Sequence, residues 1–399
     1  MAVAAVRPIA RLIAPSRAGE WWEHKLLPIL AISYATAWLL ELPPIAWLLG
    51  ALQLLGAIIP GAIFVSVIND LTDQEDDLAA GKPNRMARVA LPARILLVAL
   101  PVAIGIAWCV IWRDQPALLF PYLAAWLAFT CYSVPPLRLK HRGWAGALCD
   151  ASGAHLFPAL LAVGIAAGAA DRPIAPLWTV AVGAAAFAYG LRGILLHQLG
   201  DRDNDHLAGA RTVAVRLSPG ILAGLARWAI LPVELAALAI LFAMLGAPLI
   251  WVALGLYLLS VAQRALIWKM PVILIVPQPR AIIFLAEFYA AWLPLALLLS
   301  LALREPVAGL FAIAIHLAIF PVIAWRTGKD LLGSSGSSSV CSRRGHAQGR
   351  RRRPGSQIDG RMRDGAQGRD RTADTVIFSH VLYQLSYLGM SHRSGSERL

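Results

Sequence analysis

Long apolar stretches alternate with short polar segments along most of the chain, and this spacing predicts helices that cross a membrane. A bilayer core of about 30 Å is crossed by roughly 20 helical residues. Ten stretches approach that length: 26–42, 47–68, 91–112, 117–134, 146–169, 176–199, 220–245, 248–268, 280–302 and 305–325. The first is short and the last two are separated by only a few residues, so nine spans remain an alternative. The pattern predicts an all-α, polytopic membrane bundle of about nine to ten transmembrane helices.

Basic residues accumulate in alternate turns, which predicts how the stretches are oriented. The segment before the first stretch and the turns after every even-numbered stretch are basic, whereas the other turns are short and poorer in Lys and Arg. We therefore expect a cytoplasmic N-terminal segment at 1–24 and a transmembrane domain at 25–328. We also expect a multi-pass protein of a bacterial-type inner (cytoplasmic) membrane. In this orientation the turns after the even-numbered stretches face the cytoplasm.

The composition agrees with a membrane protein, and it shows that more than half of the net positive charge lies in one C-terminal segment. Hydrophobic residues make up 58% of the chain and charged residues 15%, against roughly 25% charged residues in soluble domains. Residues 329–399 hold 13 Lys and Arg against 6 Asp and Glu, which accounts for +7 of the net +13. This segment is rich in Gly, Ser and Arg and is predicted to be a disordered basic tail. Its charge therefore does not indicate a nucleic-acid partner, although its arginines suit contact with membrane lipid.

An acidic segment, NDLTDQEDD at 69–77, closes the second apolar stretch. If the helix continues past the membrane edge, Asn69, Asp73, Asp76 and Asp77 share one face, and Asp70, Asp73 and Asp77 likewise share a stripe. Like charges at this spacing repel, so a cation is expected between them. Oxygen ligands suit Mg²⁺, which uses one or two carboxylates and completes its shell with water and substrate phosphates.

A second acidic segment, DRDND at 201–205, closes the sixth stretch and therefore faces the same side of the membrane. Asp201 and Asp205 are four residues apart and share a helical face. Each acidic segment is followed by a glycine and then an arginine. Two acidic segments that face one cavity suit two metal-bridged contacts with a diphosphate.

A basic segment follows the fourth stretch, again on the predicted cytoplasmic side, in CYSVPPLRLKHRG at 131–143. Pro135 and Pro136 end the helix. Arg138 and Lys140 are candidate phosphate ligands, because a polyanionic substrate needs cations as well as metal-binding aspartates. Arg142 is interpreted as an anchor at the membrane surface.

Ionisable residues inside the spans are costly and indicate function or pairing. Arg192 lies nine residues before Asp201 and either reaches substrate or pairs with a carboxylate, for which Asp150 is one candidate. Four others are expected to make hydrogen bonds between helices: His155, Glu234, Glu287 and His316.

Together the three motifs resemble those of the UbiA-type intramembrane prenyltransferases. In this sequence they read NDLTDQEDD, YSVPPLRLKHRG and DRDNDHLAGART, and the similarity runs from about Trp21 to Arg326. The resemblance implies a helical bundle around a central cavity. It also implies transfer of an isoprenyl group from an allylic isoprenyl diphosphate to an aromatic or other lipophilic acceptor, with Mg²⁺ as cofactor.

The resemblance assigns roles to particular residues. Catalytic roles fall on Asp70, Asp73, Asp201 and Asp205, with metal ligands at Asn69, Asp70, Asp73, Asp77, Asp201 and Asp205. Substrate-binding roles fall on Asn69, Tyr132, Arg138, Lys140 and Arg211, to which we add Arg192. One departure concerns the second motif, where many relatives carry Asn-Asp or Tyr-Asp and this chain has His197 and Gln198; this leaves Asp201 and Asp205 as the predicted pair.

Three other functions fit parts of the pattern. A cyclase on the same fold would act on the isoprenoid without an acceptor. A transporter would also carry charged residues in its helices, but it predicts a path through the membrane, whereas these motifs lie on one side. A silent scaffold of a lipid pathway would keep the fold without the chemistry.

Overall fold

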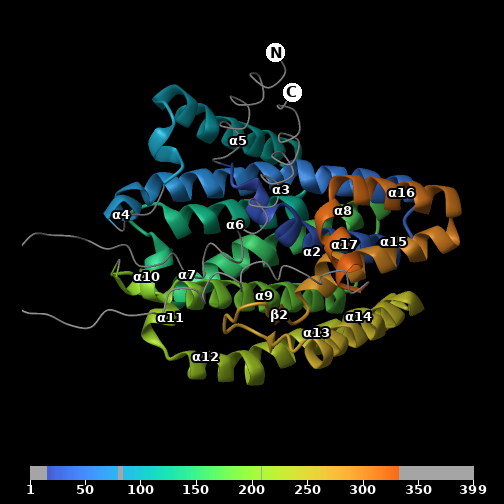
Figure 1. Ribbon diagram of the computed structural model, residues 1–399. Coiled ribbons are helices and arrows are strands. Elements are labelled where there is room, and N and C mark those ends of the chain that lie inside the picture. Colours follow the sequence, from blue (N-terminus) through green and yellow to red (C-terminus); the bar gives the residue numbers. More distant parts are fainter. Residues whose placement is uncertain (1–15, 80–83, 208, 332–399) are drawn as a thin grey trace, which may run out of the picture. The chain divides into compact units, whose positions relative to one another are not determined.

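The computed structural model describes residues 16–79, 84–207 and 209–331, and in this part of the chain nearly all regular structure is helical (Figure 1). The main helices are α2 (Ala18–Leu39), α3 (Pro44–Thr72), α5 (Leu91–Ile111), α6 (Pro116–Ser133), α7 (Trp144–Ala151), α8 (Phe157–Ala170), α9 (Pro176–Gly200), α12 (Pro219–Leu225), α13 (Leu231–Leu245), α14 (Pro248–Ile267), α15 (Leu293–Arg304) and α16 (Pro306–Ile319). Short helices are α4 (Gln74–Ala79), η2 (Met86–Arg88), η3 (Leu139–His141), α10 (Arg202–Leu207), α11 (Val213–Arg216) and α17 (Pro321–Leu331). Strands β1 (Val272–Ile273) and β2 (Ile282–Ile283) form one parallel pair. The predicted all-α class is confirmed, and the predicted tail lies outside the described residues from 332 onward.

Many helices begin at a proline, which explains where the apolar runs become helical. Six of the main helices have proline as their first residue, from Pro44 in α3 to Pro306 in α16. Proline suits this position because its φ angle is already helical and its missing N–H would have no partner in the first turn. The proline also fixes the turn that separates one span from the next.

Seven helices within the described residues are long and apolar enough to cross a membrane, or eight if α16 and α17 form one bent span. The seven are Pro44–Thr72, Leu91–Ile111, Pro116–Ser133, Trp144–Ala170, Pro176–Gly200, Pro219–Leu245 and Pro248–Ile267. Helix α2 falls outside this set and carries Glu23, His24 and Lys25 in its first half, and the apolar helix Phe288–Arg304 is shorter. The seven helices, these two and the bent pair α16–α17 correspond to the ten predicted stretches.

Two predicted stretches differ from the structure. Stretch 280–302 is not helical at its start, because Ile282 and Ile283 pair with β1 and the helix begins several residues later. Stretch 305–325 is interrupted at Phe320. The residue before a proline disfavours the helical conformation, and Phe320 precedes Pro321.

Three spans contain a π-helical turn: η4 (Ser152–Leu156), η5 (Ala226–Ile230) and η6 (Phe288–Trp292). Each turn is followed two residues later by a proline, at Pro158, Pro232 and Pro294. Proline removes one N–H donor from the helical ladder, and a widened turn is one way to accommodate that loss. These turns place His155 and Tyr289 in the protein interior.

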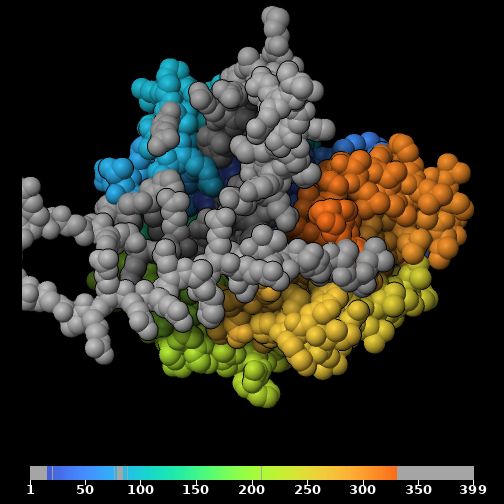
Figure 2. All heavy atoms as spheres, viewed as in Figure 1, coloured from blue at the N-terminus to red at the C-terminus, as the bar shows by residue number. Residues whose placement is uncertain are grey.

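Helix α2 is a central element, because it packs against α3, α8, α15 and η6. Its side chains Leu26, Leu27 and Leu30 are almost fully buried. By contrast, α5 exposes Leu91, Ile95, Leu96 and Leu100 among other aliphatic side chains, as expected of a helix that faces lipid. In the space-filling view, α14 (yellow) and α16 (orange) form part of the visible surface, and both expose large aliphatic side chains (Figure 2).

A buried carboxylate joins the first and last parts of the bundle. Glu23 of α2 accepts hydrogen bonds from the backbone N–H groups of Val322 (2.9 Å) and Ile323 (2.5 Å) in the first turn of α17. Trp22 donates its indole N–H to the carbonyl of Ile319. Acidic groups stabilise helix N-termini, whose first N–H groups lack intrahelical partners, so Glu23 has a structural role.

Candidate active site

The first acidic segment lies where α3 passes into α4. Asn69 and Asp70 occupy the last turn of α3, and Asp73 caps it by donating its N–H to the Asn69 carbonyl. The N–H of Asp77 in turn donates to the Asp73 carbonyl at 2.8 Å. The segment therefore continues in an almost helical path, as the spacing of its acidic residues predicts.

Two cations from the loop between α6 and α7 bind this segment. Arg138 donates from Nη2 to Asp73 Oδ1 (2.8 Å) and to the Thr72 carbonyl (2.9 Å). Lys140 donates from Nζ to Asn69 Oδ1 (2.8 Å) and also to Asp73 Oδ1. The repulsion expected within the acidic segment is thus offset by the two cations that the third motif supplies.

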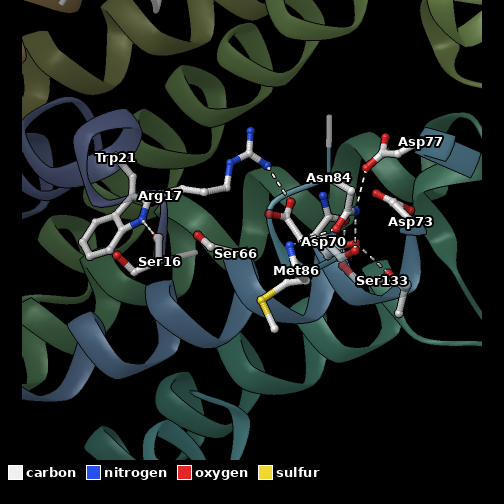
Figure 3. A network of polar contacts seen from close by, with 12 residues as sticks. Ser16, Arg17, Trp21, Ser66, Asp70, Asp73, Asp77, Asn84, Met86 and Ser133 are labelled. Carbon is white, nitrogen blue, oxygen red and sulfur yellow. Dashed lines mark hydrogen bonds and ion pairs between the residues drawn. The ribbon is translucent and has the colours of Figure 1, made fainter. Parts of the chain in front are cut away.

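Asp70 and Asp77 have different neighbours, shown in Figure 3. Asp70 is 7% exposed, and Arg17 Nη1 lies 3.5 Å from its Oδ1. Asn84 donates from Nδ2 to the Asp70 carbonyl (2.7 Å) and to Asp77 Oδ2 (2.8 Å), and its own Oδ1 accepts from the N–H of Met86 (3.0 Å). Sequence analysis did not identify Asn84; its only signal was a polar residue in the turn that follows the acidic segment.

The second acidic segment has contacts with residues close to it in the sequence. Asp201 ends α9, and His197 Nε2 lies 3.5 Å from its Oδ2. Asp205 accepts a hydrogen bond from Thr212 Oγ1 at 3.1 Å, and its carbonyl accepts from the N–H of Ala210 at 2.8 Å. Asp203, between them, is exposed, in agreement with its predicted position on the opposite face.

The loop that carries Arg138 and Lys140 also reaches the second segment. Arg142 forms an isolated parallel backbone bridge with Arg211, two residues before α11 (Val213–Arg216) begins. Gly143 has a φ of +60°, and a side chain there would lie 3.4 Å from Arg216 Nη1. At the end of α6, Ser133 donates to Asn69 Oδ1, and Tyr132 lies beside Ser133 in the last turn of the helix. The end of α6 and its loop therefore lie between the two acidic segments.

The donor set fits a metal ion held jointly with a phosphate better than one enclosed by protein alone. Among the described residues, no group of three or more His, Cys, Asp or Glu side chains is placed to hold a metal ion. Instead, Asp73 contacts Arg138 and Lys140, while Asp77 contacts Asn84. Mg²⁺ commonly binds through one or two carboxylates, with waters and substrate phosphates as its other ligands, and that requirement is met here.

An apolar cavity of about 790 Å³ opens beside the first acidic segment, and we call it the near cavity. Its walls come from α2, α3, α6, η4 and α8, and they include Phe64, Tyr122, Trp126 and Phe157. Ser66, which also lines it, is one helical turn before Asp70 on α3. The polar groups at the end of α3 thus stand at one end of a compartment lined mainly by hydrocarbon.

Arg192 is separate from this arrangement. Its Nε lies 2.6 Å from Glu234 Oε2, its Nη2 donates to Glu234 Oε1 (2.8 Å) and to the Phe284 carbonyl, and the two side chains are 2% and 0% exposed. Tyr289 donates its hydroxyl to Glu234 Oε1 at 2.8 Å. The partner is therefore Glu234 of α13 and not Asp150, and we leave Arg192 out of the proposed substrate site.

Two more of the residues that were expected to bond between helices, Glu287 and His316, do so. Glu287 forms an ion pair with Arg264 of α14 at 2.7 Å. His316 of α16 is within hydrogen-bonding distance of the Tyr34 hydroxyl of α2, at 3.3 Å. His155 packs edge-on against the ring of Tyr189.

A helical bundle with several helices long enough to cross a membrane, two acidic segments, a basic loop and an adjoining apolar cavity defines a class: intramembrane proteins with a polar site beside a hydrocarbon-lined compartment. The model of the UbiA prenyltransferase family matches residues 26–281. The chain belongs to this family.

Individual relatives and solved structures agree with that assignment. The chain is similar to the bacteriochlorophyll synthase 33 kDa chain of Cereibacter sphaeroides, with 31% identity over 194 residues that cover 44% of this chain. The match spans 58% of the length of that curated relative. The fold is similar to that of a UbiA homologue from Archaeoglobus fulgidus bound to DMAPP and Mg²⁺, with a TM-score of 0.51, 19% identity and coverage of 73% of this chain and 98% of the other. The same homologue bound to GPP and Mg²⁺ gives a TM-score of 0.50 at 18% identity, covering 73% and 99%.

Proposed function

We propose that this protein is a membrane-embedded prenyltransferase that moves an isoprenyl group from an allylic isoprenyl diphosphate to an aromatic or other lipophilic acceptor. The observation that carries the proposal is the placement of Arg138 and Lys140 on Asn69 and Asp73, at the end of the near cavity. Family membership supports it, and so do the A. fulgidus structures, which contain DMAPP or GPP with Mg²⁺.

The diphosphate would bind between the two acidic segments. Arg138 and Lys140 would contact its oxygens from one side and Arg211 from the other, with Tyr132 lining the space between. Arginine is suited to this because its planar guanidinium donates two parallel hydrogen bonds to a phosphate. Cations fixed beside a leaving diphosphate stabilise the charge that develops as the allylic C–O bond breaks.

The aspartates would link this substrate to magnesium. Asn69, Asp70, Asp73 and Asp77 would supply oxygen ligands on one side, and Asp201 and Asp205 on the other. Bound Mg²⁺ would supply positive charge to the diphosphate as it departs. Asp70, Asp73, Asp201 and Asp205 are the residues to which we assign catalytic roles on this basis.

The near cavity would hold the isoprenyl chain. Its apolar walls favour burial of hydrocarbon, and Phe64, Tyr122 and Trp126 supply aromatic surface close to the expected path of the chain. Aromatic walls also keep water from the allylic carbon, so that the acceptor rather than water captures it. The acceptor itself would enter from the lipid.

We also propose that the site opens to the cytoplasmic side of a bacterial-type inner membrane. The support is the excess of Lys and Arg in the turns after even-numbered stretches, which include all three motifs. Exposed aliphatic residues on α5 and α16 fit contact with membrane lipid, and no nucleic-acid partner is expected.

The test is a reaction in liposomes that contain the purified full chain. Labelled DMAPP and GPP are offered with a panel of lipophilic acceptors, with Mg²⁺ or with EDTA, and products are identified by mass. We expect an acceptor mass increased by one isoprenyl group, and only with Mg²⁺. Lys140→Met is expected to reduce this product at least about a hundredfold, whereas the exposed Lys269→Met provides a matched control with normal activity.

Other outcomes would identify the alternatives. A hydrocarbon product formed equally well without acceptor indicates a cyclase. Labelled diphosphate that crosses the bilayer unchanged indicates a transporter. The absence of any product or diphosphate release across the whole panel, with folded protein, would contradict the proposed activity and favour a scaffold.

A further inference from the structure

A second apolar cavity, of about 560 Å³, lies elsewhere in the bundle, and we call it the far cavity. Its walls come from α2, η4, α8, α9, α13 and the η6–α15 segment, and they include Ile32, Ala159, Tyr189 and Phe242. Among the residues that line the two cavities, Ile29 of α2 is the one they share. The two compartments therefore approach each other at this side chain.

Ile29 stands at the deep end of the near cavity. Helix α2 begins beside Arg17, which contacts Asp70, and Ile29 lies 12 residues further along. At a rise of 1.5 Å per residue this is about 18 Å from the polar end. On α3, the near cavity runs from Ser66 back to Ala57, or about 14 Å by the same measure. The depth of Ile29 on α2 is thus comparable with the length of the near cavity along α3. A chain entering from the diphosphate site would stop at this depth.

The segment formed by η4 and α8 is the wall between the cavities. It presents Ala154, Pro158 and Leu161 to the near cavity, whereas His155 and Ala159 line the far cavity. Helix α2 packs against this wall, and Ile29 is 4% exposed. Ala154 and Ala159 of this wall are small, and Ile29 is the side chain that lines both compartments.

The far cavity has the properties of a compartment for hydrocarbon. Apart from His155, the indole N–H of Trp178 and the hydroxyls of Tyr189 and Tyr289, its walls are apolar, and the Trp178 N–H already donates to Thr36. The Tyr289 hydroxyl is already used, because it donates to Glu234. A substrate group entering here would therefore meet mainly aliphatic and aromatic surface, as the end of an isoprenyl chain requires.

We propose that Ile29 is the partition between the near and far cavities and that it limits the length of isoprenyl chain the protein accepts. This inference rests on the proposed function, since it takes the near cavity as the isoprenyl compartment. Replacing Ile29 by a smaller residue opens the far cavity to the end of a longer chain.

The test measures binding along a ladder of isoprenyl diphosphates. The full chain in detergent with Mg²⁺ is titrated with ionisation-resistant thiolo-diphosphate analogues of increasing chain length, from dimethylallyl and geranyl upward, so no acceptor is needed. In the wild type, affinity rises with each isoprene unit until the near cavity is filled and then stops rising. In Ile29→Ala, we expect it to continue rising for at least one further unit, with about tenfold tighter binding of that analogue than in the wild type, because additional hydrocarbon is buried.

Ile32→Ala is the matched control, since it makes the same change one turn further along α2 at a residue that lines only the far cavity. It is expected to leave the length at which affinity stops rising unchanged. The double variant Ile29→Ala/Ala186→Leu refills part of the far cavity, and the gain should be lost. Ile29→Val is expected to give a smaller shift of the same sign, and it decides the question if Ile29→Ala does not fold.

The two proposals fail in different ways. If no analogue binds the wild type in a Mg²⁺-dependent manner, the proposed function fails. If the wild type binds but folded Ile29→Ala and Ile29→Val keep its length limit, or if Ile32→Ala shifts it equally, the partition is wrong and the proposed function stands.

Discussion

The two acidic segments have similar sequence patterns but different surroundings. In the first, Asp73 contacts both Arg138 and Lys140, and Asp70 is 7% exposed beside Arg17. In the second, Asp201 lies beside His197, and Asp205 accepts a hydrogen bond from Thr212. The same i, i+4 spacing of aspartates therefore occurs in one segment that contacts Arg138 and Lys140 of another loop and in one whose observed contacts include His197 and Thr212 nearby in the sequence.

This difference indicates a division of labour in the proposed reaction. The first segment already has the cations that a diphosphate would contact, together with the adjoining near cavity. In the proposed reaction the second segment would contribute oxygen ligands from the opposite side, and Asp203 between its two aspartates is exposed. We therefore expect substitutions in the first segment to be the more damaging, and the following experiments can break that ranking.

The largest effect is expected for Asp73→Asn. This change keeps the size of the side chain but removes the negative charge shared by Arg138 and Lys140, so both the metal contact and the position of the two cations are disturbed. Loss of one preorganised electrostatic group costs roughly 10²–10³ in rate, and we expect the upper end for kcat/KM. Glu75→Gln, at an exposed position in the same segment, should be unchanged; equal losses in both variants would show that only the overall charge of the segment matters.

A large effect on stability, without one on substrate binding, is expected for Arg192→Met. The change leaves Glu234 buried without its cation, and breaking a buried pair in this way costs about 3–5 kcal/mol. Thermal unfolding in detergent should show it, while the Mg²⁺-dependent affinity for a geranyl thiolo-diphosphate stays the same. Arg192→Met/Glu234→Leu should recover much of the stability; a selective loss of ligand affinity would instead return Arg192 to the substrate site.

Sequence patterns predict the helices of this protein better than the partners of its charges. Most of each apolar stretch is helical because continuous hydropathy is a local property, and the break at Phe320 is local too, at the residue before Pro321. The approach of Lys140 to Asn69 could be predicted in outline from the sequence, because both motifs close even-numbered spans on the same predicted side of the membrane. The role of Lys140 and Asn69 in substrate binding is still a proposal, whereas the contact between them is observed in the structure.

Contacts that depend on helix packing could not be predicted in the same way. Glu234 was expected to bond between helices and does, but its choice of Arg192 over more distant groups follows from how α9 packs against α13. The carboxylate of Glu23 finds its donors at Val322 and Ile323, about 300 residues away. No local spacing encodes such a pair, because it is set only when the bundle is assembled.

An intermediate effect is expected for Asp205→Asn in the second segment. The residue would lose a metal-binding charge but keep an acceptor for Thr212 Oγ1, so the turn should survive. We expect kcat/KM to fall about a hundredfold, with more Mg²⁺ needed for half-maximal rate. Asp203→Asn at the neighbouring exposed position should have little effect. A loss greater than that of Asp73→Asn would reverse the proposed ranking of the two segments.

The smallest effect is expected for Gln198→Leu, and it addresses why the second segment lacks the residue pair that many relatives carry before it. Gln198 is 4% exposed, and its Oε1 accepts the backbone N–H of Val213 at 3.2 Å. It therefore links α9 to α11 by a hydrogen bond, which an acidic metal ligand at this position would not be needed to do. Leucine would leave that N–H buried and unsatisfied, at a cost of about 1–3 kcal/mol in the free energy of unfolding. If the Mg²⁺ dependence of the reaction rate is unchanged in the folded variant, Gln198 has a structural role. A changed Mg²⁺ dependence at unchanged stability would instead place Gln198 among the residues that govern metal binding.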